Sequence, residues 1–79
     1  MLNNIHGFDE KPPKIAYVDP SFFINLMVKD SLFFEDCRDY SEKLKGGKTV
    51  LVMSNIENII TTDSDFKRID DLEVYTCND

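Results

Sequence analysis

The stretch "NIITTDSDFKRI", residues 58–69, decides the fold of this chain. Its first half is rich in β-branched residues and predicts a strand over residues 58–63. Its second half, "SDFKRI", predicts one helical turn, and "LEVYT" (72–76) alternates as a last strand that we expect at an edge of the sheet. A strand that ends in Asp-Ser-Asp ends either in a solvated turn or at a cation.

A similar strand and helix are predicted near the start of the chain. The apolar run "KIAYVD" (14–19) lies between Pro13 and Pro20 and predicts a buried strand. "FFINLMVKD" (22–30) predicts one or two helical turns, and Ser21 is placed to cap them.

The clearest helix is predicted over "LFFEDCRDYSEKLKGG", residues 32–47. Its apolar residues recur at helical steps, and Gly46-Gly47 is a typical helix end. The two predicted helices form a helical hairpin after the first strand.

The middle of the chain is ambiguous. "TVLVMS" (49–54) predicts a strand, although residues 49–57 also fit a short helix. Only "NIE" (55–57) separates this run from the next strand, whereas a parallel crossover needs about ten residues or more. We therefore expect two antiparallel neighbours, or that one of the two runs is not a strand.

These elements predict a small α/β domain with a mostly parallel sheet of about four strands. The domain spans residues 14–79, with a short helix before its last strand. Residues 1–13 are polar, contain Pro12-Pro13, and are expected to form a flexible extension outside the core.

Composition narrows the classes of function. The 79 residues carry a net charge of −6, so nucleic-acid binding would need a local basic strip or a bridging metal. No apolar run approaches the ~20 residues of a membrane span. The two cysteines, Cys37 and Cys77, match no metal or redox spacing and are expected to be free thiols in the cytoplasm.

Acidic residues follow two of the predicted strands. Asp19 ends the first strand and Asp63 ends the strand of the opening stretch, with Asp65 close behind. Adjacent parallel strands would bring these carboxylates to one edge of the sheet, where two carboxylates can hold Mg²⁺. The alternative is that Asp19 and Asp63 simply cap the helices that follow them.

The segments "IAYVDPSFFINLMVKD" and "IITTDSDFKRIDDLEVY" resemble the two ends of a PIN domain. The resemblance implies a doubly wound sheet and a Mg²⁺- or Mn²⁺-dependent ribonuclease, a hydrolase best known among the toxins of toxin–antitoxin pairs. It implies that Asp19 and Asp63 are catalytic metal ligands, that Asp65 is the second acid of the closing motif, and that Ser21 is the hydroxyl beside the first acid.

The chain departs from this family in its short middle section, where Glu57 is the only acid. Glu57 is therefore a further candidate metal ligand: if residues 49–54 are the second strand of the family, it stands close to the usual glutamate. If Glu57 instead opens the strand that ends at Asp63, it lies about 20 Å from the cation, given ~3.3 Å per strand residue. We favour that geometry, which predicts a miniature PIN-like protein with a reduced acidic cluster.

Two functions follow from this interpretation. The first is a metal-dependent endoribonuclease in which Lys67 and Arg68 contact the RNA backbone. The second is a catalytically degenerate PIN scaffold that acts as a homodimer or binds a small protein partner. A small unrelated α/β adaptor is a third possibility.

Overall fold

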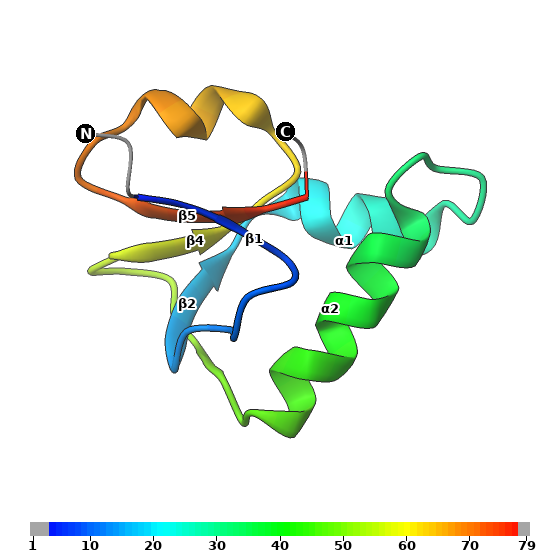
Figure 1. Ribbon diagram of the computed structural model, residues 1–79, viewed down its shortest axis with the longest axis horizontal. Coiled ribbons are helices and arrows are strands. Elements are labelled where there is room, and N and C mark those ends of the chain that lie inside the picture. The colour runs from blue at the N-terminus through cyan, green and yellow to red at the C-terminus, as the bar shows by residue number, and fades with distance from the viewer. Residues whose placement is uncertain (1–3, 78–79) are drawn as a thin grey trace.

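The computed structural model describes residues 4–77, which form a small α/β domain with a five-stranded sheet (Figure 1). In chain order the elements are β1 (Ile5–Gly7), β2 (Ile15–Val18), α1 (Pro20–Met27), α2 (Phe34–Gly46), β3 (Val50–Leu51), β4 (Asn58–Ile60), the 3-10 helix η1 (Ser64–Arg68) and β5 (Glu73–Thr76). The predicted α/β class, the helical hairpin after β2 and the short helix before β5 are confirmed.

The strands lie in the order β1-β5-β4-β2-β3, and all four pairings are parallel. Figure 1 shows α1 and α2 together on one side of the sheet, whereas η1 lies apart from them beside β5. The chain therefore leaves β2 through two helices toward β3, and leaves β4 through η1 toward β5.

The core lies between the sheet and the two helices. Alternate residues of β2 and β4 point toward α1 and α2, so that Ala16, Val18 and Ile60 pack with Phe22, Cys37 and Tyr40. These six side chains are buried, and Ile60 and Cys37 are completely so. The apolar residues that recur along α2 therefore pack into the core, as the sequence predicts.

The ambiguous middle of the chain contains β3 followed by a connection over residues 52–57. The expectation that the strands on either side are antiparallel neighbours is wrong, because β3 and β4 both run parallel to β2 and flank it. β3 pairs with Ile15 and Ala16, whereas β4 pairs with the next two residues of β2. The connection over residues 52–57 therefore carries the chain from one side of β2 to the other. No helix forms over 49–57.

The N-terminal segment contradicts the prediction that residues 1–13 lie outside the core. Ile5–Gly7 pairs with β5 as a parallel strand, and Phe8 stacks on the core side chain Tyr40 with ring centroids 4.0 Å apart. β5 is consequently an inner strand between β1 and β4, and its expected place at the edge is also wrong. Of the predicted extension, residues 1–3 lie outside the described residues.

The helix ends follow local chemistry, with two differences from the prediction. Asp19, not Ser21, is the N-cap of α1, and Pro20 takes the first helical position, where a missing N–H costs nothing. α2 ends at Gly46 as predicted, but Gly47 has φ −84°. The left-handed residue after this helix is Lys48, with φ 56°.

Candidate functional site

The candidate site lies where β2 and β4 end side by side. The chain winds from β2 toward one edge of the sheet and from β4 toward the other, so the winding direction changes between these strands. In open parallel sheets ligands bind outside the carboxyl ends of the strands at such a point. Asp19 directly follows β2, and its backbone N–H donates to the Ile60 carbonyl at 2.9 Å. Residues 61–63 directly follow β4.

The Asp19 carboxylate is half-buried and held through a single oxygen. Its Oδ2 accepts hydrogen bonds from the Ser21 backbone N–H at 3.1 Å and from the Thr61 hydroxyl at 3.1 Å. Within residues 4–77, no hydrogen bond reaches its Oδ1. One oxygen therefore serves the cap of α1, and the other is available to a ligand.

The Asp63 carboxylate is exposed and has a similar arrangement. Its Oδ1 accepts from the Asp65 backbone N–H at 2.9 Å and caps η1. Its backbone N–H donates to the Thr61 hydroxyl at 3.0 Å. Both aspartates therefore cap the helices that follow them, as the alternative interpretation predicts. Each cap uses only one of the two carboxylate oxygens.

A chain of hydroxyl groups connects the two strand ends. The Thr62 backbone N–H donates to the Ser21 hydroxyl at 3.1 Å, and the hydroxyls of Ser21 and Thr61 lie 3.0 Å apart. Since the Asp19 carboxylate can only accept, Thr61 donates to it and Ser21 donates to Thr61. All donors therefore point toward one negative charge, an arrangement in which each bond strengthens the next.

Two further polar side chains support this network from α1 and the loop after it. The Asn25 amide donates to the Ser21 carbonyl at 2.8 Å and to the Thr62 hydroxyl at 3.1 Å. Ser31 in turn hydrogen-bonds to Asn25. Sequence reasoning missed Asn25, Thr61 and Thr62; the only signal was a pair of threonines directly before the acidic strand end.

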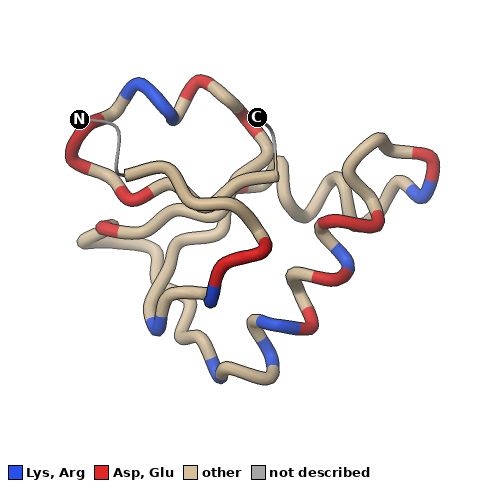
Figure 2. Tube along the Cα trace, viewed as in Figure 1, with Lys and Arg blue, Asp and Glu red and all other residues tan. Residues whose placement is uncertain are grey.

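The remaining predicted site residues are not part of this network. Glu57 precedes β4, where its carbonyl accepts from the Glu73 N–H at 2.8 Å, so it lies at the opposite end of the strand from Asp63. Asp65 is exposed at the start of η1. Lys67 and Arg68 form the basic stretch of η1 in Figure 2, with acidic residues on either side.

The acids do not form a large cluster. Over the part of the chain that the structure describes, no group of three or more His, Cys, Asp or Glu residues is arranged to hold a metal ion. Carboxylate oxygens are nevertheless the hard ligands that Mg²⁺ and Mn²⁺ take, and Mg²⁺ is often held by one or two carboxylates with several waters. Asp19 and Asp63 supply two such carboxylates, directly after β2 and three residues after β4.

A second feature is an apolar surface shared by α1 and β3. Phe23, Ile24 and Met27 of α1 and Leu51 of β3 are 46–79% exposed. Together with Met53 we name them the α1–β3 surface. A groove of about 570 Å³ runs along it, and β3 has a neighbouring strand on one side only within the described residues 4–77.

Comparisons with protein-family models, with curated proteins and with solved structures gave no match for this chain. Among residues 4–77, no helix has the length and apolar character needed to cross a membrane.

Proposed function

We propose that this protein is a PIN-like ribonuclease that depends on Mg²⁺ or Mn²⁺ and has a reduced acidic cluster. The observation that carries the proposal is the pair of aspartates at the ends of the adjacent strands β2 and β4, where the winding of the sheet reverses. Because each carboxylate has one oxygen outside the cap hydrogen bonds, the pair can ligate a cation without loss of either helix cap.

The residues around the pair have complementary roles in this proposal. A bound Mg²⁺ or Mn²⁺ supplies charge to polarise the scissile phosphate and to activate water. Asp19 and Asp63 would hold the ion, and the Ser21 and Thr61 hydroxyls orient Asp19. Asp65 orients water, and the η1 cations Lys67 and Arg68 contact the RNA backbone. With a net charge of −6, the chain needs this local positive charge to bind RNA.

The proposal predicts weak metal binding and slow turnover. Glu57 is at the far end of β4 and adds no ligand, so only two or three acids contribute. The proposal includes a cytoplasmic location, where RNA is present and the thiols of Cys37 and Cys77 stay reduced.

The first experiment measures thermal unfolding with and without millimolar Mn²⁺. A ligand that binds only the folded state raises the midpoint. We expect an increase for the wild type and for Glu57→Gln, which removes an equal charge at the wrong end of the strand. We expect no increase for Asp63→Asn, since asparagine still caps η1. Equal increases in all three proteins would exclude the site.

The second experiment measures cleavage of single-stranded RNA with Mn²⁺. Wild type and Glu57→Gln should cleave it slowly, and Asp19→Asn should not. Equal cleavage by the wild type and Asp19→Asn would assign the activity to a contaminant and overturn the ribonuclease proposal.

A second candidate function is that of a catalytically degenerate scaffold that dimerises through the α1–β3 surface. Its support is the set of exposed apolar side chains beside the unpaired side of β3, since exposed edges and large apolar patches mark association surfaces. Sedimentation should then show a dimer that Met27→Lys with Leu51→Lys dissociates. Ile69→Lys, at a half-exposed residue after η1, is the control. A monomeric wild type at high concentration would contradict this function.

A further inference from the structure

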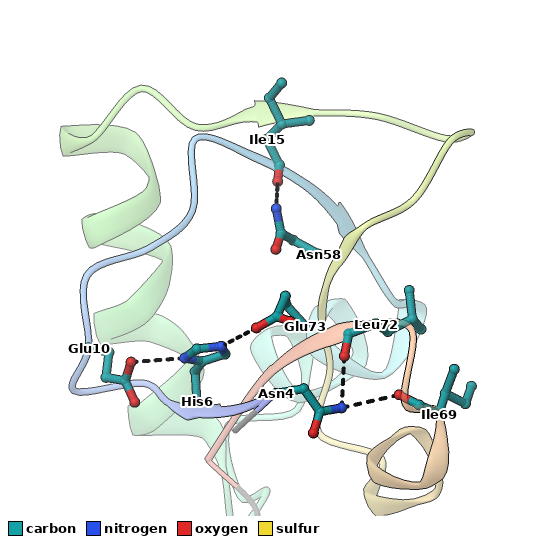
Figure 3. A network of polar contacts seen from close by, with 8 residues as sticks. All are labelled: Asn4, His6, Glu10, Ile15, Asn58, Ile69, Leu72 and Glu73. Atoms are coloured by element: carbon teal, nitrogen blue, oxygen red, sulfur yellow. Dashed lines mark hydrogen bonds and ion pairs between the residues drawn. The ribbon is translucent and has the colours of Figure 1, made fainter. Parts of the chain in front are cut away.

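His6, the only histidine of the chain, is on the N-terminal strand β1, and its ring lies between two carboxylates. Figure 3 shows its ring between Glu10 and Glu73: Nδ1 lies 2.9 Å from Oε1 of Glu10, and Nε2 lies 2.7 Å from Oε1 of Glu73. The ring also stacks on Tyr75 of β5, with ring centroids 4.4 Å apart. The side chain is only 21% exposed.

These contacts require a particular protonation state. A neutral imidazole has one N–H donor, and its other nitrogen is an acceptor. An ionised carboxylate is also only an acceptor, so a neutral ring would place two lone pairs against each other at one of these contacts. The doubly protonated ring donates to both Glu10 and Glu73, and the two hydrogen bonds then become ion pairs.

We propose that His6 is a pH-sensitive latch, which holds residues 4–10 on the sheet when its ring is doubly protonated and loosens them when the ring loses one proton. The latch connects this segment with β5 through Glu73. The same segment carries Phe8, which covers the core residue Tyr40, and Asn4, whose carbonyl accepts from the Val74 N–H at 2.7 Å.

The electrostatics agree with the geometry. Partial burial lowers the pKa of His6, but the hydrogen bonds and charges of Glu73 and Glu10 outweigh it, so the pKa is raised above its ordinary value of 6.5. The pKa of Glu10 is lowered, chiefly by its hydrogen bond to His6.

Other ionisable groups also lie near the latch. Burial raises the pKa of Tyr75 behind the ring and of Tyr40 on α2, so both stay neutral. Lys43 of α2 donates to the Phe8 carbonyl at 2.7 Å, and Asp9 lies in the segment itself.

The sign of the effect follows from linkage. A group whose pKa is higher in the folded than in the unfolded state stabilises the fold fully below its unfolded pKa. That contribution decreases as pH rises through the folded pKa. The latch is therefore closed below about pH 6.5 and opens at higher pH. Opening would expose the side of β5 that pairs with β1, which is a surface that can accept another strand.

The test combines two NMR measurements on the intact chain. The ring ¹³C and ¹⁵N shifts should give a His6 pKa above 6.5, and Glu73→Gln should lower it. Amide exchange, corrected for intrinsic rates, should show that the opening equilibrium at the Val74 amide increases with pH. The increase is at most tenfold for each unit by which the His6 pKa in the folded state exceeds its value in the unfolded state. The Asp19 amide, bonded to β4, is the internal control and should not share this increase.

His6→Phe is the matched variant, because phenylalanine keeps a ring against Tyr75 but cannot titrate. In this variant we expect the opening equilibrium at the Val74 amide, corrected for intrinsic exchange rates, to be independent of pH. A His6 pKa at or below 6.5 would overturn the latch. The same holds if His6→Phe keeps the pH dependence of the wild type.

Discussion

The buried hydroxyl of Thr61 donates to the Asp19 carboxylate at 3.1 Å and so connects the end of β4 with the start of α1. The same hydroxyl accepts from the Asp63 backbone N–H at 3.0 Å. Both aspartates that the sequence predicts as ligands are therefore positioned by one side chain. Helix capping and ligand binding are compatible here, because the network uses one oxygen of each carboxylate.

The first prediction concerns this hydroxyl. Thr61→Val keeps the shape of the side chain but leaves the Ser21 hydroxyl and the Asp63 N–H without their buried acceptor. A buried polar group without a partner costs about 1–3 kcal/mol, so the free energy of unfolding in urea should fall by that amount. Thr61→Ser keeps the hydroxyl and should lose less. An equal loss in both variants would mean that the methyl group matters more than the network.

The elements around this site were predictable because their signals are local. The apolar run of β2, the helical repeat of α2 and the β-branched residues of β4 each specify their own element. β1 has no such signal: "IHG" shows no alternation, and its position is set by β5, about 70 positions away in the sequence. This pairing also makes β5 an inner strand. The wrong prediction of an N-terminal extension and the wrong prediction of β5 as an edge strand therefore have the same cause.

The second prediction tests whether the N-terminal segment belongs to the domain. The Asn4 amide donates to the carbonyls of Leu72 at 2.9 Å and Ile69 at 3.2 Å, and thereby closes the turn between η1 and β5 (Figure 3). Because Asn4 is buried, Asn4→Ala should lower the free energy of unfolding by about 1–3 kcal/mol.

Asn58→Ala is the matched control for Asn4. The Asn58 amide donates to the Ile15 carbonyl at 2.9 Å, but in an exposed position, so its loss should cost no more than about 1 kcal/mol. An Asn4→Ala variant as stable as the wild type would show that the N-terminal segment does not contribute to the domain.

The candidate site was predictable only in part. An acid at the end of each of two parallel strands is visible in the sequence, and the strands are neighbours as that prediction requires. The hydroxyl network is not visible, because it depends on the register that brings Ser21 opposite Thr61. The metal and catalytic roles of the two acids stay predictions.

The third prediction concerns the turn after α2. Lys48 has φ 56°, a conformation that costs a residue with a Cβ about 1–2 kcal/mol. Lys48→Gly removes this strain but increases the entropy of the unfolded chain by about 0.4–1 kcal/mol. The net expected effect is a gain of about 0.5 kcal/mol in the free energy of unfolding. Lys48→Ala keeps the Cβ and should show no gain. An equal gain in both variants would assign the effect to the lost charge.

The last prediction concerns Tyr40, the core residue beneath Phe8. Its hydroxyl is buried and has no hydrogen-bond partner among residues 4–77, and burial is the main reason that its pKa is raised. Phenylalanine would keep the stack on Phe8 and the edge contact with Phe22. Since an unpaired buried hydroxyl costs about 1–3 kcal/mol, Tyr40→Phe should raise the free energy of unfolding by about 1 kcal/mol.

Tyr17→Phe is the control for this variant, because Tyr17 is only half-buried and the loss of its hydroxyl should change the stability by less than about 0.5 kcal/mol. Urea denaturation of both variants measures the difference. If Tyr40→Phe instead destabilised the protein by 1 kcal/mol or more, the Tyr40 hydroxyl would have a partner in solution. The packing of the N-terminal segment over the core would then have a polar component that its aromatic contacts do not account for.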